Sequence, residues 1–123
     1  MKAILFLSAA AVFAASTATA EIRPDDSRAV EDRVAAADAK VATADTAFQA
    51  GDTRQGCKAL LGAAHELDRS IDISIHMIER ANQYGEPLER HETVVVMQSR
   101  LQSIVDRRSD IQTELQDRCA RSA

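Results

Sequence analysis

Three segments of this chain place apolar side chains at alternating intervals of three and four residues, and this spacing is the strongest constraint on its fold. Side chains at such intervals form a stripe along one side of an α-helix. Proline and glycine stand between the segments and are absent from the stripes themselves. The pattern predicts three helices, at about residues 25–49, 53–84 and 87–120.

Residues with known preferences for helix ends bracket each segment. Pro24 precedes the first stripe and Gly51 follows it. Asp52 can cap the second helix, which Gly85 would end, and Pro87 would open the third. The stripes comprise Val30, Val34, Ala37, Val41, Ala44 and Phe48 in the first segment; Cys57, Leu60, Ala64, Leu67, Ile71, Ser74, Ile78 and Ala81 in the second; and Leu88, Val94, Met97, Leu101, Ile104, Ile111 and Leu115 in the third.

The connections between these segments are short, which makes consecutive helices antiparallel neighbours. Aromatic residues make up only 3% of the chain, and there are four glycines and two prolines, too few turn residues for a β-rich fold. The sequence therefore predicts an all-α, up-down-up three-helix bundle, in which the second and third helices form a long hairpin.

The two cysteines provide a test of this hairpin. If the chain turns near residues 85–87, Cys57 and Cys119 lie at nearly the same height on the second and third helices. Both lie on or next to the inward stripe. We therefore predict one disulfide bond between Cys57 and Cys119, which would stabilise a small core that is poor in aromatic residues.

The first twenty residues resemble a cleavable secretory signal. Lys2 is followed by an apolar run from Ala3 to Ala15, and a small-x-small site, Ala18 to Ala20, precedes Glu21. We expect residues 1–20 to be removed and residues 21–123 to form a single domain without stable membrane insertion. Arginine accounts for 12 of the 15 basic residues, which favours a bacterial source and hence the periplasm.

The charge distribution argues against nucleic acid as a partner. Cleavage after Ala20 would remove one of 15 basic residues and none of the 19 acidic ones, leaving an acidic domain. The basic residues are interleaved with acidic ones and form no cluster. The chain also lacks phosphate-binding, nucleophile-elbow, zinc-protease and haem-attachment motifs. We therefore expect a protein without cofactor or enzymatic activity.

One charged residue interrupts the third stripe. Arg108 occupies a position between Ile104 and Ile111 where an apolar residue would continue the pattern. It lies near the height of Glu66 and Asp68 on the second helix. We expect an ion pair with one of these two carboxylates, which would fix the register of the hairpin as polar core residues do in coiled coils. The alternative is that Arg108 binds a ligand.

The second and third helices are apolar on more than one side near the hairpin turn. The first helix is the shortest. Its N-terminal end is expected to lie level with about residue 76 of the second helix and to leave the rest of the hairpin uncovered. We therefore predict an exposed patch formed by some of four residues in this region. These residues are Ile73, Met77, Val95 and Val96.

Three interpretations of this region remain open, one of which is that these side chains are simply part of a more tightly packed core. The other two give the region a function. The first is a surface that binds a protein partner or a second copy of the chain, which would make the protein a small interaction or chaperone-like accessory protein. The second is a carrier of a soft metal such as copper, or of another small ligand. Thioether and imidazole groups suit Cu(I), and the metal ligands would be His76, Met77, His91 and Met97.

Overall fold

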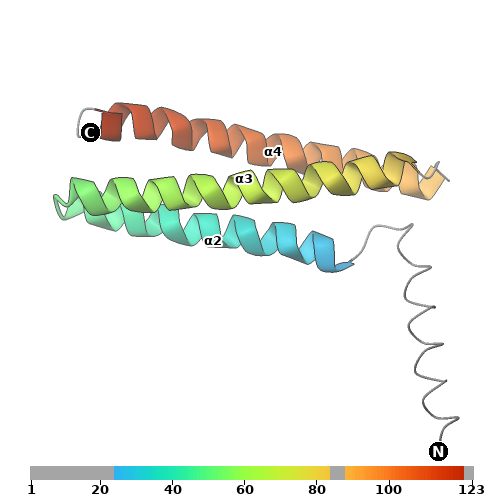
Figure 1. The fold of residues 1–123 in the computed structure, drawn as a ribbon, viewed down its shortest axis with the longest axis horizontal. Helices are drawn as coiled ribbons and strands as arrows, with labels where there is room; N and C mark the ends of the chain where they lie inside the picture. The colour runs from blue at the N-terminus through green and yellow to red at the C-terminus, as the bar shows by residue number, and fades with distance from the viewer. Residues whose placement is uncertain (1–23, 84–87, 121–123) are drawn as a thin grey trace, which may run out of the picture.

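The computed structural model describes residues 24–83 and 88–120, which form three α-helices and no β-strand. Helix α2 spans Pro24–Gln49, α3 spans Thr53–Gln83 and α4 spans Leu88–Cys119. The helices run antiparallel in sequence order, with α3 between α2 and α4 (Figure 1). The predicted all-α bundle with a long hairpin is confirmed, and the predicted helix bounds agree with the observed ones to within one residue.

Two expectations concern residues that the structure does not describe. The proposed signal segment, residues 1–20, and the hairpin turn at residues 84–87 lie outside the described ranges. Both therefore stay predictions.

The turn between α2 and α3 contains a residue typical of helix C-termini followed directly by one typical of helix N-termini. Gly51 has a φ of 81°, a left-handed conformation that glycine adopts without a steric penalty. The Asp52 amide donates to the Ala47 carbonyl at 2.9 Å, and the Gly51 amide donates to Phe48 at 3.0 Å, which closes α2 with a Schellman motif. Asp52 then caps α3, because its Oδ1 accepts from the Gln55 amide at 3.1 Å.

The core runs along α3, which is buried on two sides because it contacts both of the other helices. The predicted stripes supply most of its side chains, and each stripe is buried or packed against buried residues over its described part. The fully buried side chains include Leu60 and Leu67 of α3 and Val30 of α2. Ser70 is also buried, and its hydroxyl donates to the Leu67 carbonyl at 2.8 Å.

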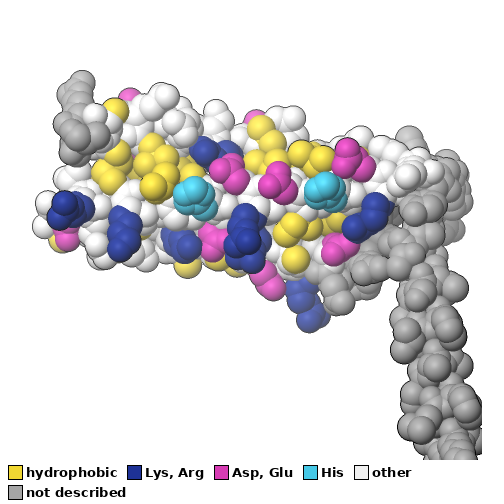
Figure 2. Space-filling model, in the orientation of Figure 1, with side chains coloured by type: hydrophobic (Ala, Val, Ile, Leu, Met, Phe, Trp, Pro, Cys, Tyr) yellow, Lys and Arg dark blue, Asp and Glu magenta, His cyan; other side chains and the backbone are white. Residues whose placement is uncertain are grey.

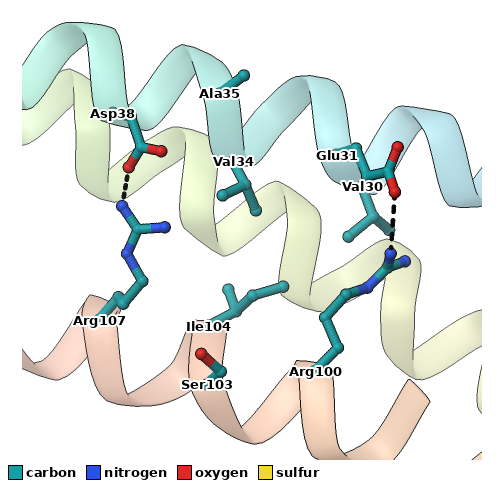
Figure 3. A pocket seen from close by; sticks show the side chains of 9 residues that line it. All are labelled: Val30, Glu31, Val34, Ala35, Asp38, Arg100, Ser103, Ile104 and Arg107. Atoms are coloured by element: carbon teal, nitrogen blue, oxygen red, sulfur yellow. Dashed lines mark ion pairs between the residues drawn. The ribbon is translucent and has the colours of Figure 1, made fainter. Parts of the chain in front are cut away.

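Helices α2 and α4 pack closely on α3 but less closely on each other. Two arginines of α4 extend toward acidic residues of α2 and bridge the space between these helices. Arg100 pairs with Glu31 at 3.5 Å, and Arg107 pairs with Asp38 (Figure 3). The bundle is therefore closed by apolar packing along α3 and by ion pairs between α2 and α4.

Candidate interaction surface

The structure separates the four residues of the predicted patch. Val95 and Val96 are exposed on α4, with 50% and 67% of their surface accessible. Ile73 is partly buried and packs against the core. Met77 is only 1% exposed, so its assignment to an exposed patch is wrong.

The position of α2 explains the burial of Met77. The carboxylate of Asp26, in the first turn of α2, pairs with the guanidinium of Arg80 on α3. The first turn of α2 therefore contacts α3 through the side chain of Arg80, which lies about one turn beyond residue 76. Ile73 lies one helical turn before Met77, on the same side of α3. It therefore lies beside α2 and does not join Val95 and Val96 in one surface.

Other apolar side chains are exposed along α3 and α4 at positions that the sequence analysis did not place in the patch. They are Leu61, Ile75 and Val105, with 51%, 40% and 39% of their surface accessible. Leu61 and Ile75 are 14 residues apart, which is close to four turns, so they share one side of α3. Leu61 and Ile75 lie outside the inward stripe and are separated by two heptads. This spacing is the sequence signal from which their shared side of the helix could have been predicted.

A groove between α3 and α4 contains Leu61. It has a volume of about 550 Å³. Figure 2 shows hydrophobic side chains gathered between α3 and α4 near the C-terminal end of α4, with charged and histidine side chains along the exposed side of α3. The groove is lined by Cys57, Lys58, Leu61, Gln112, Leu115, Gln116, Cys119 and Ala120.

The disulfide forms one wall of this groove. The sulfur atoms of Cys57 and Cys119 are at bonding distance and their Cα atoms are 5.8 Å apart, which confirms the predicted pair. Beside the disulfide, the Arg118 guanidinium lies 4.5 Å from the centre of the Phe48 ring. The end of α4 is therefore attached to α3 by a covalent bond and to the end of α2 by a cation–π contact.

Arg108 forms the predicted ion pair with one of its two candidate partners. Its Nε donates to Asp68 Oδ1 at 2.8 Å, and its Nη2 lies 3.5 Å from Asp68 Oδ2. A further donor, Nη1, contacts Gln112 at 3.0 Å, on the rim of the groove. Glu66 does not take part, because its side chain is bound by residues of α2.

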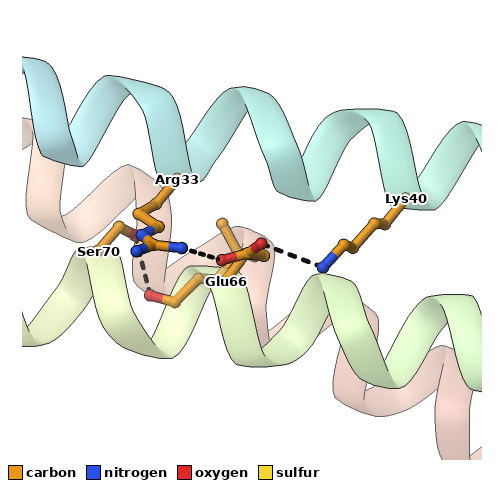
Figure 4. Close-up of polar contacts among 5 residues, drawn as sticks. Arg33, Lys40, Glu66 and Ser70 are labelled. Carbon is orange, nitrogen blue, oxygen red and sulfur yellow. Dashed lines mark hydrogen bonds and ion pairs between the residues drawn. The ribbon is translucent and has the colours of Figure 1, made fainter.

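Glu66 is held between two basic side chains of α2 (Figure 4). Its carboxylate oxygens accept from Arg33 Nη1 and from Lys40 Nζ, each at 3.0 Å. Only 13% of the Glu66 side chain is exposed. The hydrogen bond from Lys40 and then that from Arg33 lower the pKa of Glu66 below its ordinary value of 4.5. This contact was not predicted from the sequence, where Glu66 was considered only as a partner of Arg108 on α4.

The described candidate copper ligands differ in their exposure to solvent. The His76 side chain is 74% exposed and its Nδ1 lies 3.5 Å from Glu79, whereas Met77 and Met97 are buried in the core. The side chain of His91 is outside the described part of the chain. Among the described residues, no group of three or more histidine, cysteine, aspartate or glutamate side chains could hold a metal ion.

A second, smaller groove of about 310 Å³ lies between α2 and α4 (Figure 3). Val30, Val34 and Ile104 form its apolar lining, and the pairs of Arg100 with Glu31 and of Arg107 with Asp38 cross it. Each of these four charged side chains is therefore already paired with a side chain of the facing helix. This groove is smaller than the one beside the disulfide, and two ion pairs cross it.

Comparison of the chain with protein families, with curated proteins and with solved structures finds no match. Within residues 24–83 and 88–120, none of the helices combines the length and the apolar character that crossing a bilayer requires.

Proposed function

We propose that this chain is a small, exported, non-enzymatic helical protein of the bacterial periplasm that binds the apolar side of an amphipathic polypeptide helix. The binding site is the groove between α3 and α4. The observation that carries this proposal is that Leu61, exposed by half of its surface, lies in a groove that Leu115 and the disulfide also line.

The shape and composition of the groove suit a helical ligand. Grooves between two packed helices commonly accept a third helix through anchors spaced three or four residues apart. Ile75 and Val105 extend the exposed apolar side chains along the same pair of helices, beyond the groove itself. Lys58 and the glutamines on the rim supply polar contacts at the boundary with water.

The residues that line the groove also favour binding over catalysis. An enzyme of the acid–base type needs a paired acid and base within reach of a substrate. The lining of this groove holds one lysine, two glutamines and the disulfide, together with apolar groups. Neither a carboxylate nor a histidine is among them.

The proposal is tested by titrating the oxidised protein with an amphipathic peptide built only of leucine and lysine, using isothermal titration calorimetry. We expect micromolar binding, and a loss of at least about tenfold in affinity for Leu61→Glu, which places a charge against the apolar side of the ligand. Val95→Glu is the matched control, because Val95 is equally exposed but lies outside the groove. Absence of binding, or an equal loss in both variants, would contradict the proposal.

The proposed export has its own test. Native mass spectrometry of the protein recovered from a bacterial periplasm should give a chain that begins at Glu21 and is lighter by two hydrogens than the reduced form. Material that keeps residues 1–20 would contradict cleavage, and protein recovered only from the cytoplasm would contradict export.

A further inference from the structure

The exposed side of α3 carries a second stripe with the same three-and-four spacing as the buried one. Its members are exposed except for Asp68, which is half-buried beside Arg108. Because the spacing is that of a helix surface, these side chains follow one line along α3 for about 31 Å. They are Lys58, Leu61, His65, Asp68, Asp72, Ile75 and Glu79.

This stripe is nearly symmetric about its central member, Asp68, because the other members lie 10, 7 and 3 residues before it and 4, 7 and 11 residues after it, and the two halves are complementary in chemistry. Leu61 and Ile75 are the two apolar members, each seven residues from the centre. The basic Lys58 near one end corresponds to the acidic Glu79 near the other. When a second α3 is laid antiparallel on the first with the two-fold axis between Asp68 and Arg69, Lys58 of one copy comes level with Glu79 of the other, and Leu61 comes within one residue of the level of Ile75.

The remaining positions fit the same arrangement. His65 comes level with Asp72 of the second copy, which joins a histidine to a carboxylate. At the centre, Asp68 already accepts from Arg108 of its own chain at 2.8 Å. The exposed Arg69 comes level with Asp68 of the second copy and supplies a further basic group there. At the centre of the contact, the two Asp68 carboxylates are therefore accompanied by the Arg108 and Arg69 side chains of both copies.

We propose that the exposed stripe of α3 is a homodimer interface, in which two copies of this chain pack antiparallel with the two-fold axis between Asp68 and Arg69. Such an interface is isologous, so each contact occurs twice. This inference rests on the proposed function, because it names a second copy of the chain as the polypeptide that covers Leu61. The dimer is a weak one, since only two of the seven positions on each copy are apolar.

Charge reversal at the ends of the stripe gives a test that is specific to this register. The full chain is purified under non-reducing conditions, and its self-association is measured by sedimentation equilibrium. Lys58→Glu and Glu79→Lys each replace two attractive contacts per dimer by two repulsive ones, so each should weaken dimerisation by about tenfold or more. The double variant Lys58→Glu/Glu79→Lys should regain dimerisation, because both contacts are again between opposite charges.

A mixture of the two single variants gives the sharpest measurement. Each variant repels itself, but in the mixed dimer both end contacts join opposite charges. We therefore expect heterodimers in the mixture and mainly monomers in either variant alone. Val95→Glu, which lies outside the stripe, is the control and should dimerise like the unchanged protein.

The outcomes separate this inference from the proposed function. A monomer that still binds the leucine–lysine peptide through Leu61 would overturn the homodimer and leave the groove as a site for another polypeptide. A monomer that binds no peptide would overturn both. A dimer that neither single variant weakens, or that the double variant fails to restore, would show that the copies associate through a different surface.

Discussion

The two neighbours of α3 are held to it in different ways. Along α2 the buried contacts are made largely by small side chains, among them Ala37, Ala44 and Ala63, all with no exposed surface. A Cβ atom placed on Gly56 would lie 2.5 Å from the Phe48 ring, so a larger residue there would require the ring to move. Small side chains allow the two helices to approach closely and to bury a continuous seam.

Along α4 the buried contacts are made by larger side chains and are interrupted. Ile104 and Ile111 are buried, but Arg108 stands between them, and Leu115 is only partly covered. The disulfide then joins the last turn of α4 to the first turn of α3. The difference shows that α2 is held by continuous packing, whereas the C-terminal part of α4 depends on a few anchors and a covalent bond.

Among the variants that test this difference between α2 and α4, removal of the disulfide should have the largest effect on the free energy of unfolding. The bond closes a loop with a sequence separation of 62 residues. In the chain-entropy model, Cys57→Ser/Cys119→Ser lowers the free energy of unfolding by about 4 kcal/mol, as an upper bound. Urea denaturation measures this loss, and hydrogen exchange should show that amides in the last turns of α4 lose protection before those of α2. Equal loss in both helices would contradict the contrast.

Enlarging a side chain in the α2–α3 seam should have the next largest effect. Ala37→Leu forces a larger side chain between closely packed helices and should cost about 1–3 kcal/mol in the free energy of unfolding. Ala42→Leu, at an exposed position of the same helix, is the control and should change that free energy by less than about 0.5 kcal/mol. If both variants unfold at the same urea concentration, the seam is looser than the structure indicates.

The Glu66 contact should contribute about 1 kcal/mol, because its basic partners are partly exposed and solvent weakens their attraction. Its pKa is lowered in the folded chain, so this stabilisation is present above pH 4.5 and is lost as the pH falls through the folded-state pKa. Denaturation at several pH values should show the unchanged protein losing its advantage over Glu66→Gln at acid pH. A difference that stays constant down to acid pH would contradict this assignment.

Arg108→Leu should have the smallest effect in the oxidised protein, because the disulfide already fixes the height of α4 on α3. We expect a change of less than about 1 kcal/mol there, since Asp68 is half-exposed and remains hydrated. In a Cys57→Ser/Cys119→Ser background the register hypothesis predicts a larger effect, seen as lower unfolding cooperativity. Unchanged helicity, cooperativity and oligomeric state in that background would show that Arg108 does not set the register.

The fold was predictable from sequence because its determinants are local or periodic. Apolar stripes, Gly51, Asp52 and the flanking prolines specify helices and their ends through interactions within a few residues. The pairing of Cys57 with Cys119 followed from the heights of two residues in one hairpin. Each of these inferences compares positions on one helix or on two helices joined by a short turn.

The candidate surface was predicted less well because exposure depends on where a third helix ends. The sequence places Met77 among apolar residues of the hairpin, whereas the structure buries it in the core, at a height where α2 still contacts α3 through the pair of Asp26 with Arg80. The partner of Glu66 was decided in the same way, by side chains of α2. For Leu61, Ile75 and Val105, the sequence indicates apolar character, and the tertiary structure decides that they face solvent.

By itself, then, the sequence determines the helices, their order and the covalent link, since helix periodicity and chain connectivity act over short distances. Only the tertiary structure decides which sides of α3 are covered and which remain exposed. The physical reason is that a helix presents apolar residues in several directions, and burial is settled by the rotation and length of the neighbours that pack against it.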